Sequence, residues 1–341
     1  MKKFSPKTRV FVALMGGKLD RLPVTSLAGC GATVTTEMQH VTRVFWPEAH
    51  KDPEKMARLA IASYELGKIE CVRIPFDFVV EAEALGCKVK FGGIESIPWI
   101  IDQPYKNPEE LKMPDNILEL GRIPVVLKAI RIVRERVGDF LPISSLIMGP
   151  LTLASLLVGT EKLLMWTIKE RDYVRPFVDF ATDFIIEYGK AQYRAGSDIV
   201  QVSDPVASPD QIKPDTFKQF AMPALTKVAD NLGGIKLLHI CGKTEPIISD
   251  MAECGYNGIS VEENVDVAKI KPLVGDVKIL GNVSSKLTLL FGLPDEIKAE
   301  VKKAIEAGVD IVEPSCGFVP STPIANIRAM VETAKRFGSR S

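Results

Sequence analysis

The sequence predicts a single (β/α)8 barrel, an α/β fold of the TIM-barrel type, with a helical extension at its N-terminus. Three observations predict it: a recurring helix–glycine–strand pattern, eight candidate strands, and no linker dividing the 341 residues. The pattern RAGSDIVQVSDP at residues 194–205 returns as EAGVDIVEPSCG at residues 306–317. Glycine suits the position after a helix because it adopts the left-handed conformation at little cost. We therefore expect one barrel domain over residues 1–341.

Eight apolar runs are the candidate strands. Their apolar residues are nearly continuous, as in parallel sheets that are covered on both faces. Eight βα units favour a closed barrel over a doubly wound sheet, and no GxGxxG motif follows the first strand to support the second fold. In chain order the predicted strands are residues 21–27, 71–77, 142–150, 197–205, 235–242, 258–263, 278–285 and 310–317.

Helical patterns lie at the start of the chain and between the strands. Residues 1–21 indicate an amphipathic helix rather than a signal peptide, because the apolar run Val10–Met15 is short and Gly-Gly-Lys follows it. Asp52 is the expected cap of a helix over Pro53–Gly67, where proline suits the first turn. The pattern at residues 293–308 is charged on one side and ends on glycine. We expect these last two segments to be crossover helices.

Composition narrows the classes of function. Lys+Arg and Asp+Glu each total 43, so no basic excess indicates nucleic acid, and small-molecule chemistry is the default. Six cysteines spread along a long chain do not indicate a disulfide framework. No apolar stretch approaches the roughly 18 to 20 residues that cross a bilayer. We expect a cytoplasmic protein with neither a nucleic-acid nor a membrane partner.

The motif LLHICG at residues 237–242 carries one of only three histidines in the chain. His239 and Cys241 are two residues apart, so both side chains project from the same face of a strand. Cys316 lies at the corresponding end of the last predicted strand, and barrel active sites lie at these carboxyl ends. One imidazole and two thiolates suit a catalytic Zn²⁺ site, which keeps its fourth position open. The alternative is that the cysteines are small core residues and the histidine a satisfied one.

Other residues at the strand ends complete the candidate site. Glu262 or Glu263 could supply a fourth, displaceable ligand, or could be a solvated loop carboxylate. Asp204 is a candidate acceptor for the zinc-bound imidazole, because such imidazoles commonly donate to a carboxylate. Gly149 and Pro150 fit either the pocket or turn chemistry. The predicted substrate pocket contains Met148, Asp204, Asn282 and Ser284.

The remaining cysteines and histidines show no ligand spacing. We expect structural roles for the cysteines and surface positions for the two histidines. The residues concerned are Cys30, Cys71, Cys87 and Cys254, and His40 and His50.

The ligand set also indicates a kind of chemistry. Two cysteinates place negative charge on the metal, which makes it a weaker Lewis acid for generating hydroxide and suits it to a substrate thiolate. A free thiol has a pKa of about 8.5 and is mostly protonated at neutral pH, whereas a coordinated thiol is deprotonated. The site therefore favours thiol alkylation over hydrolysis.

From KTRVFVALMGGKLDRLPV to SCGFVPSTPIANIRAMV, the chain resembles the uroporphyrinogen decarboxylase superfamily over almost its full length. MGPLTLASLL at residues 148–157 resembles the mid-chain signature of that superfamily, and HICGKTEPI with NGISVEE resembles its strand five and six region. The HxC motif with the late PSCG is similar to the methylcobalamin:coenzyme M methyltransferases of methylotrophic methanogenesis, as are WPEAHKDPE and VSDPVASPD.

This resemblance implies His239, Cys241 and Cys316 as zinc ligands. It also implies transfer of a methyl group from a corrinoid (methylcobalamin) on a separate partner protein to a small thiol, coenzyme M. No Asp-x-His-x-x-Gly motif is present, so the corrinoid is expected to arrive on its partner and to dock at the barrel mouth. The decarboxylases carry an arginine-rich motif after their first strand, whereas no arginine lies between Leu22 and Thr42 here. Since carboxylate recognition relies on guanidinium groups, porphyrinogen decarboxylation is not expected.

Two alternatives remain open on the sequence. The first is a methyltransferase of the opposite direction, which loads a corrinoid protein from a methylated amine, ether or alcohol. The second is a non-catalytic zinc or corrinoid-protein binder. Three protein ligands argue against the second, because a structural zinc site is usually closed by four.

Overall fold

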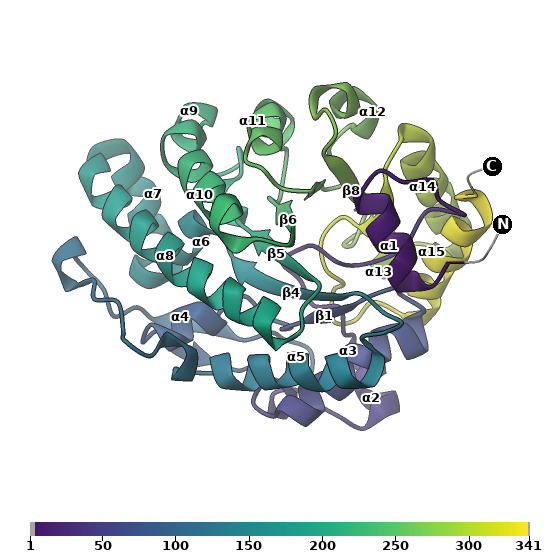
Figure 1. The fold of residues 1–341 in the computed structure, drawn as a ribbon, viewed down its shortest axis with the longest axis horizontal. Helices are drawn as coiled ribbons and strands as arrows, with labels where there is room; N and C mark the ends of the chain where they lie inside the picture. The colour runs from purple at the N-terminus through teal and green to yellow at the C-terminus, as the bar shows by residue number, and fades with distance from the viewer. Residues whose placement is uncertain (1–3, 340–341) are drawn as a thin grey trace.

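A curled sheet of seven parallel strands forms the centre of this computed structural model, which describes residues 4–339. The strand order follows the chain, so consecutive strands of this sheet are neighbours joined by crossovers. Helices surround the sheet on its outer side (Figure 1). The strands of this sheet are β1 Val72–Ile74, β4 Ile143–Met148, β5 Ile199–Ser203, β6 Ile235–His239, β7 Gly258–Ser260, β8 Lys278–Val283 and β9 Ile311–Pro314.

The helices begin and end close to the capping signals in the sequence. The predicted helix over Pro53–Gly67 is confirmed with those bounds, and the Asp52 carboxylate accepts hydrogen bonds from the amides of Glu54 and Lys55. The α-helices are α1 Pro6–Leu14, α2 Thr36–Thr42, α3 Pro53–Gly67, α4 Val80–Ala84, α5 Ile123–Val137, α6 Pro150–Val158, α7 Thr160–Lys169, α8 Arg171–Ala195, α9 Pro214–Thr216, α10 Met222–Leu232, α11 Ile248–Glu253, α12 Val267–Ile270, α13 Thr288–Phe291, α14 Pro294–Ala307 and α15 Ile324–Phe337.

One predicted helix differs in length, and one hairpin was not predicted. The N-terminal helix is shorter than the predicted segment 1–21, covering Pro6–Leu14, and residues 1–3 lie outside the described part of the chain. The sequence pattern did not reveal the antiparallel hairpin of β2 (Lys88–Lys90) and β3 (Trp99–Asp102). This hairpin is largely exposed, so no buried face gives it an apolar alternation.

The first predicted strand, residues 21–27, is wrong as a strand. Its backbone makes one isolated parallel bridge, between Val24 and Val312 of β9. The Thr25 amide donates to the Val312 carbonyl oxygen at 2.9 Å, and the Val312 amide donates to the Pro23 carbonyl oxygen at 3.0 Å. On the other side, the Glu70 amide donates to the Val24 carbonyl oxygen at 2.9 Å. The segment therefore lies between β9 and the residues that lead into β1.

The chemistry of this segment explains why it forms no longer ladder. Pro23 has no amide hydrogen to donate. The Val24 amide donates to the Glu70 carboxylate at 3.1 Å instead of to a neighbouring strand. The buried Glu313 carboxylate of β9 accepts the Thr25 hydroxyl at 2.5 Å and the Leu27 amide at 2.5 Å. Side-chain carboxylates thus accept from the Val24 and Leu27 amides, which a longer strand would have paired with backbone.

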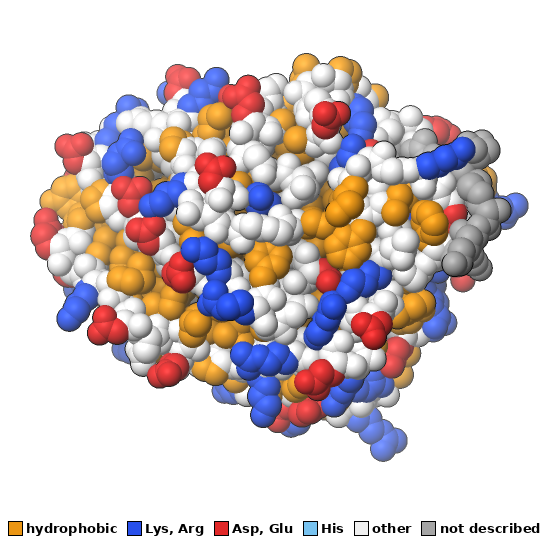
Figure 2. Space-filling model, in the orientation of Figure 1, with side chains coloured by type: hydrophobic (Ala, Val, Ile, Leu, Met, Phe, Trp, Pro, Cys, Tyr) orange, Lys and Arg blue, Asp and Glu red, His pale blue; other side chains and the backbone are white. Residues whose placement is uncertain are grey.

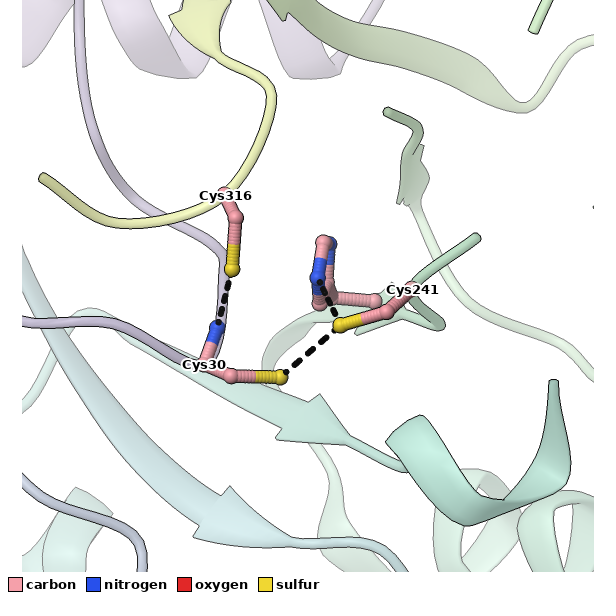
Figure 3. Close-up of side chains that lie close together, drawn as sticks. Cys30, Cys241 and Cys316 are labelled. Carbon is pink, nitrogen blue, oxygen red and sulfur yellow. Dashed lines mark hydrogen bonds between the residues drawn. The ribbon is translucent and has the colours of Figure 1, made fainter. Parts of the chain in front are cut away.

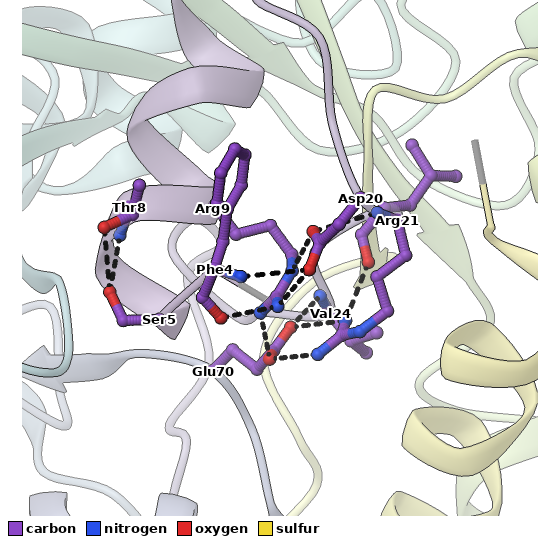
Figure 4. A network of polar contacts seen from close by, with 9 residues as sticks. Phe4, Ser5, Thr8, Arg9, Asp20, Arg21, Val24 and Glu70 are labelled. Atoms are coloured by element: carbon purple, nitrogen blue, oxygen red, sulfur yellow. Dashed lines mark hydrogen bonds and ion pairs between the residues drawn. The ribbon is translucent and has the colours of Figure 1, made fainter. Parts of the chain in front are cut away.

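A buried ion network fastens α1 to this segment (Figure 4). The Arg9 guanidinium donates to Asp20 and, at 2.8 Å, to Glu70. Arg21 donates to both oxygens of Glu70, at 2.9 and 2.5 Å. The hydrogen bond from Arg9 lowers the pKa of Asp20 to about 2, so this carboxylate stays ionised at neutral pH. Glu70 therefore links the N-terminal helix, Val24 and the start of β1.

The surface carries charges of both signs. Figure 2 shows acidic and basic side chains interspersed over one face, with apolar side chains between them, in keeping with the equal totals in the sequence. No single helix within residues 4–339 is long and apolar enough to cross a membrane. Together, α6 and α7 reach the required length and composition, but across a bend of 109°.

Candidate metal centre

The HxC motif places both of its side chains at the carboxyl edge of the sheet. His239 is the last residue of β6, and Cys241 follows two residues later. The His239 side chain is fully buried, and its Nε2 lies 3.3 Å from Cys241 Sγ. The shared orientation predicted from the two-residue spacing is therefore confirmed.

Two more cysteines from opposite ends of the chain join them (Figure 3). Cys316 lies two residues beyond the end of β9. Cys30 lies in the irregular segment that follows the Val24 bridge, and its Sγ is 3.3 Å from Cys241 Sγ. The Cys30 amide donates to Cys316 Sγ at 3.2 Å. One ligand atom from each of Cys30, His239, Cys241 and Cys316 lies within 4.8 Å of the others.

The expectation that Cys30 is structural is therefore wrong, because its thiol belongs to this cluster. Its sequence signal was its place just after the first predicted strand, at another carboxyl end. That signal is weak, because Cys30 has no ligand-like spacing to Cys241 or Cys316. The cluster has four donors. The predicted set of three ligands with an open fourth position therefore lacks one donor.

The four groups strongly perturb one another. Hydrogen bonds from Cys241 and Cys30, together with the nearby imidazole of His239, hold the pKa of Cys316 well below its usual range. Burial lowers the pKa of His239, but the neighbouring Cys30 and Cys316 raise it well above its usual value. Without a metal, these opposite shifts favour a thiolate on Cys316 beside a protonated His239. A metal would take the place of the proton, since thiolate and neutral imidazole are the ligand forms.

The donor set and its spacing fit Zn²⁺. Zinc bonds of about 2.3 Å to sulfur and about 2.0 Å to nitrogen in a tetrahedron put ligand atoms roughly 3.5 to 3.8 Å apart. The observed limit of 4.8 Å requires only small adjustments of side chains. Three sulfur donors also exclude a hard, oxygen-preferring cation such as Mg²⁺.

Neither predicted carboxylate belongs to the four-residue cluster. Glu262 and Glu263 instead line a cavity of about 160 Å³ together with Cys316, Lys286 and Phe318. Burial and the nearby Cys316 raise the pKa of Glu262. Glu263 accepts the Ser284 hydroxyl at 2.9 Å. The fourth donor of the cluster is therefore Cys30 and not Glu262 or Glu263.

The four predicted pocket residues do not line this cavity. Met148 and Ser284 are buried, and the Asn282 amide donates to the carbonyl oxygens of Glu262 and Val265. Asp204 is fully buried and caps the start of α6, where it accepts the Leu151 amide, the Thr152 amide and the Thr152 hydroxyl.

Burial raises the pKa of Asp204 to about 6, although these hydrogen bonds oppose the shift. A Cβ on Gly149 would stand 2.3 Å from the Asp204 Cβ, and Pro150 is the first residue of α6. The turn interpretation therefore fits Gly149 and Pro150.

His50 does not lie on the surface, so the expectation of a surface position is wrong. It is fully buried, and its Nδ1 lies 3.0 Å from an oxygen of Asp77, which also receives two hydrogen bonds from Arg122. The surface position of His40 is confirmed. Cys71, Cys87 and Cys254 are buried away from the cluster, in agreement with structural roles.

Ser260 of β7, rather than Asp204, holds the imidazole of His239. The Ser260 hydroxyl lies 3.0 Å from His239 Nδ1 and is fully buried. This contact leaves Nε2 directed at the cysteine cluster, and the hydroxyl can accept from Nδ1–H when Nε2 binds a metal.

Replacing Ser260 by alanine is expected to weaken zinc binding about 10- to 100-fold, because the imidazole loses the partner that orients it. Competition with a chromophoric chelator measures the affinity. Ser145→Ala is the matched control, since this buried hydroxyl bonds Ser197 and not the cluster. Equal zinc affinity in Ser260→Ala and wild type would contradict the role of Ser260.

Fold and site together define an α/β protein of parallel strands with a cysteine and histidine cluster, suited to a metal, at the carboxyl edge of its sheet. The chain belongs to the uroporphyrinogen decarboxylase (URO-D) family, which it matches over residues 5–337. The superfamily resemblance seen in the residues is thereby confirmed.

Comparison with individual proteins narrows the relationship. The chain is 44% identical over 334 residues to the methylcobamide:CoM methyltransferase MtaA of Methanosarcina barkeri, covering 97% of this chain and 98% of the relative. It is also similar to the solved structure of a methyltransferase from Methanosarcina mazei, with TM-score 0.94, 43% identity and coverage of 98% and 99%. A B12-independent methionine synthase from Shewanella shares the fold at TM-score 0.60 and 13% identity, covering 93% of this chain and 97% of that one.

Proposed function

We propose that this chain is a zinc-dependent methyltransferase that moves a methyl group from a methylated corrinoid to a thiol, coenzyme M. The observation that carries the proposal is the donor cluster of three thiols and one imidazole, with no carboxylate among its members. Such a thiolate-rich set makes a metal poor at generating hydroxide and suits it to a sulfur substrate. The 44% identical relative, a methylcobamide:CoM methyltransferase, supports the choice of both substrates.

His239, Cys241, Cys316 and Cys30 would hold the zinc, and Ser260 would orient the imidazole. When bound, the metal supplies the means to keep a substrate thiol deprotonated at neutral pH. Cys30 would be the donor best able to make room for a substrate thiol, because its Sγ has an alternative partner in the Ser203 hydroxyl, 2.9 Å away.

The cavity beside Cys316 is the proposed entry for the thiol. Its volume of about 160 Å³ suits a small molecule, and Phe318 and Val319 give part of its wall an apolar surface. Holding sulfur and methyl carbon in line there can lower the barrier by several kcal/mol. The reaction forms a sulfur–carbon bond and breaks the cobalt–carbon bond, whose electron pair stays on the cobalt of the methyl donor.

The same proposal includes a partner protein, a complete fold and a cellular location. The methyl donor is a corrinoid protein that docks at the carboxyl edge of the sheet, where the cluster lies. We infer a single domain, a (β/α)8 barrel with an N-terminal helical extension, in which the Val24 segment takes the place of the first strand. A cytoplasmic location agrees with the free thiols that the reaction requires.

Anaerobic visible spectroscopy tests the proposal. Zinc-loaded protein is mixed with free methylcobalamin and coenzyme M, and the methylcobalamin spectrum is expected to convert to that of Co(I). Other small thiols test the choice of acceptor, and Cys316→Ala tests the site. No conversion with any thiol, in protein shown to hold one zinc, would overturn the proposal in favour of a corrinoid-loading methyltransferase or a non-catalytic zinc binder.

A further inference from the structure

Cys30 differs from the other cluster residues in how the fold positions it. His239 ends β6, and Cys241 and Cys316 each follow the end of a strand by two residues, so the sheet places all three. Cys30 instead lies in irregular backbone between the isolated bridges of Val24 and Ala32. Other contacts must therefore hold its thiol at 3.3 Å from Cys241 Sγ.

The Gln201 side chain of β5 binds the backbone of Gly29, the residue before Cys30. This side chain is fully buried. Its Oε1 accepts the Gly29 amide at 3.2 Å, and its Nε2 donates to the Gly29 carbonyl oxygen at 3.2 Å. One side chain thus satisfies both polar groups of Gly29, which sits at a φ of 120° that only glycine adopts without strain.

Arg73 of β1 binds the backbone of the same segment. It is 1% exposed, and its guanidinium donates to the carbonyl oxygen of Gly29 at 3.1 Å and to that of Gly31. Within residues 4–339 it makes no ion pair with a carboxylate. A buried guanidinium without a carboxylate needs another source of negative charge.

The metal cluster supplies part of that charge, and the buried Glu313 carboxylate near Arg73 supplies another part. Three thiolates, a neutral imidazole and Zn²⁺ sum to a net charge of −1, which one guanidinium balances. The Cys30 and Cys316 segments also touch: the Phe318 amide donates to the Ala32 carbonyl oxygen at 2.8 Å, and a Cβ on Gly317 would stand 2.1 Å from the Gly31 carbonyl carbon. The backbone on both sides of Cys30 is therefore held in place.

We propose that Arg73 and Gln201 are positioning residues of the metal centre, which clamp the Gly29–Gly31 backbone so that Cys30 supplies the third thiolate, with Arg73 balancing its charge. This inference rests on the proposed function, because it requires the cluster to bind a metal. Neither residue touches the substrate or the reacting atoms in this account.

Cobalt substitution tests the proposal through the number of thiolate ligands. The intensity of the sulfur-to-Co²⁺ charge-transfer absorption reports that number, and Cys30→Ser provides the two-thiolate reference. Wild type is expected to show three thiolates, whereas Gln201→Met and Arg73→Met are expected to show two. Their zinc affinity is expected to fall about 10- to 100-fold, as for other groups that orient ligands.

Two further variants sharpen the test. Gln192→Met removes a buried amide that bonds the Leu146 carbonyl oxygen and is expected to leave three thiolates. Arg73→Lys keeps the charge but lacks the fork that spans two carbonyls, so it is expected to show two. Arg73→Lys also replaces Arg73→Met in the test if the latter variant fails to fold, which circular dichroism will reveal.

Three thiolates in folded Gln201→Met and Arg73→Lys would overturn the clamp, as would only two in wild type. In either case the proposed function would stand. A wild-type protein that binds neither Co²⁺ nor Zn²⁺ would overturn the proposed function, and this inference with it.

Discussion

The variant Cys241→Ala is expected to remain folded, to lose its zinc and to lose more than about 100-fold of its methyl-transfer rate. Loss of a ligand must exceed the roughly 10- to 100-fold effect of losing an outer hydrogen bond. Cys241 is central to the cluster, with one neighbouring donor atom 3.3 Å away on Cys30 and another on His239. Zinc content after gel filtration, circular dichroism and the methylcobalamin assay measure the three quantities.

Cys87→Ala is the matched control, because this cysteine is equally free but buried outside the cluster. It is expected to keep both zinc and activity. If Cys241→Ala were to unfold, the metal would be structural rather than catalytic. If the variant kept its zinc and its rate, Cys241 would not be a ligand and the proposed function would fail.

The substitution Glu70→Gln is expected to lower the free energy of unfolding by about 3 to 5 kcal/mol, the usual cost of breaking a buried ion pair by removing one partner. Glu70 is 2% exposed and accepts from Arg9, Arg21 and the Val24 amide. Glutamine keeps the shape but removes the charge and turns a donor toward these donors. Urea unfolding followed by circular dichroism measures the change.

Glu65→Gln provides the comparison for this second prediction. Glu65 also pairs with an arginine, Arg58, but both side chains are more than 40% exposed. An exposed pair contributes about 0 to 1 kcal/mol, so this variant is expected to unfold close to wild type. Equal destabilisation by the two substitutions would show that burial of the Glu70 network adds nothing.

Local pattern was sufficient to predict most of the sheet and three of the four cluster residues. Seven predicted strands are present in shortened form, because a continuous apolar run marks a strand buried on both faces. His239 and Cys241 could be paired from their spacing alone, since side chains two residues apart share a face. Cys316 followed from counting strands to the same edge.

The errors have a common cause, which is contact between distant parts of the chain. Cys30 joins the cluster through Gln201 and Arg73, and no local spacing encodes those hydrogen bonds. The Val24 segment does not form a strand because its donors bind the carboxylates of Glu70 and Glu313, which lie far away in sequence. The position of Asp204 at the end of a strand predicts a pocket residue. Its carboxylate instead accepts three hydrogen bonds from a helix some 50 residues earlier in the chain.

The placement of Cys30 and Cys316 near opposite ends of the chain has a consequence for protein synthesis. Cys316 lies 286 residues after Cys30, so the ribosome makes the last thiol of the cluster long after the first. The contact between Val24 and Val312 also joins residues that are far apart in the sequence, and such contacts form slowly. A nascent chain therefore exposes Cys30 without the full set of donors until Cys316 has been made, so a metal held by all four donors would be acquired only after that point.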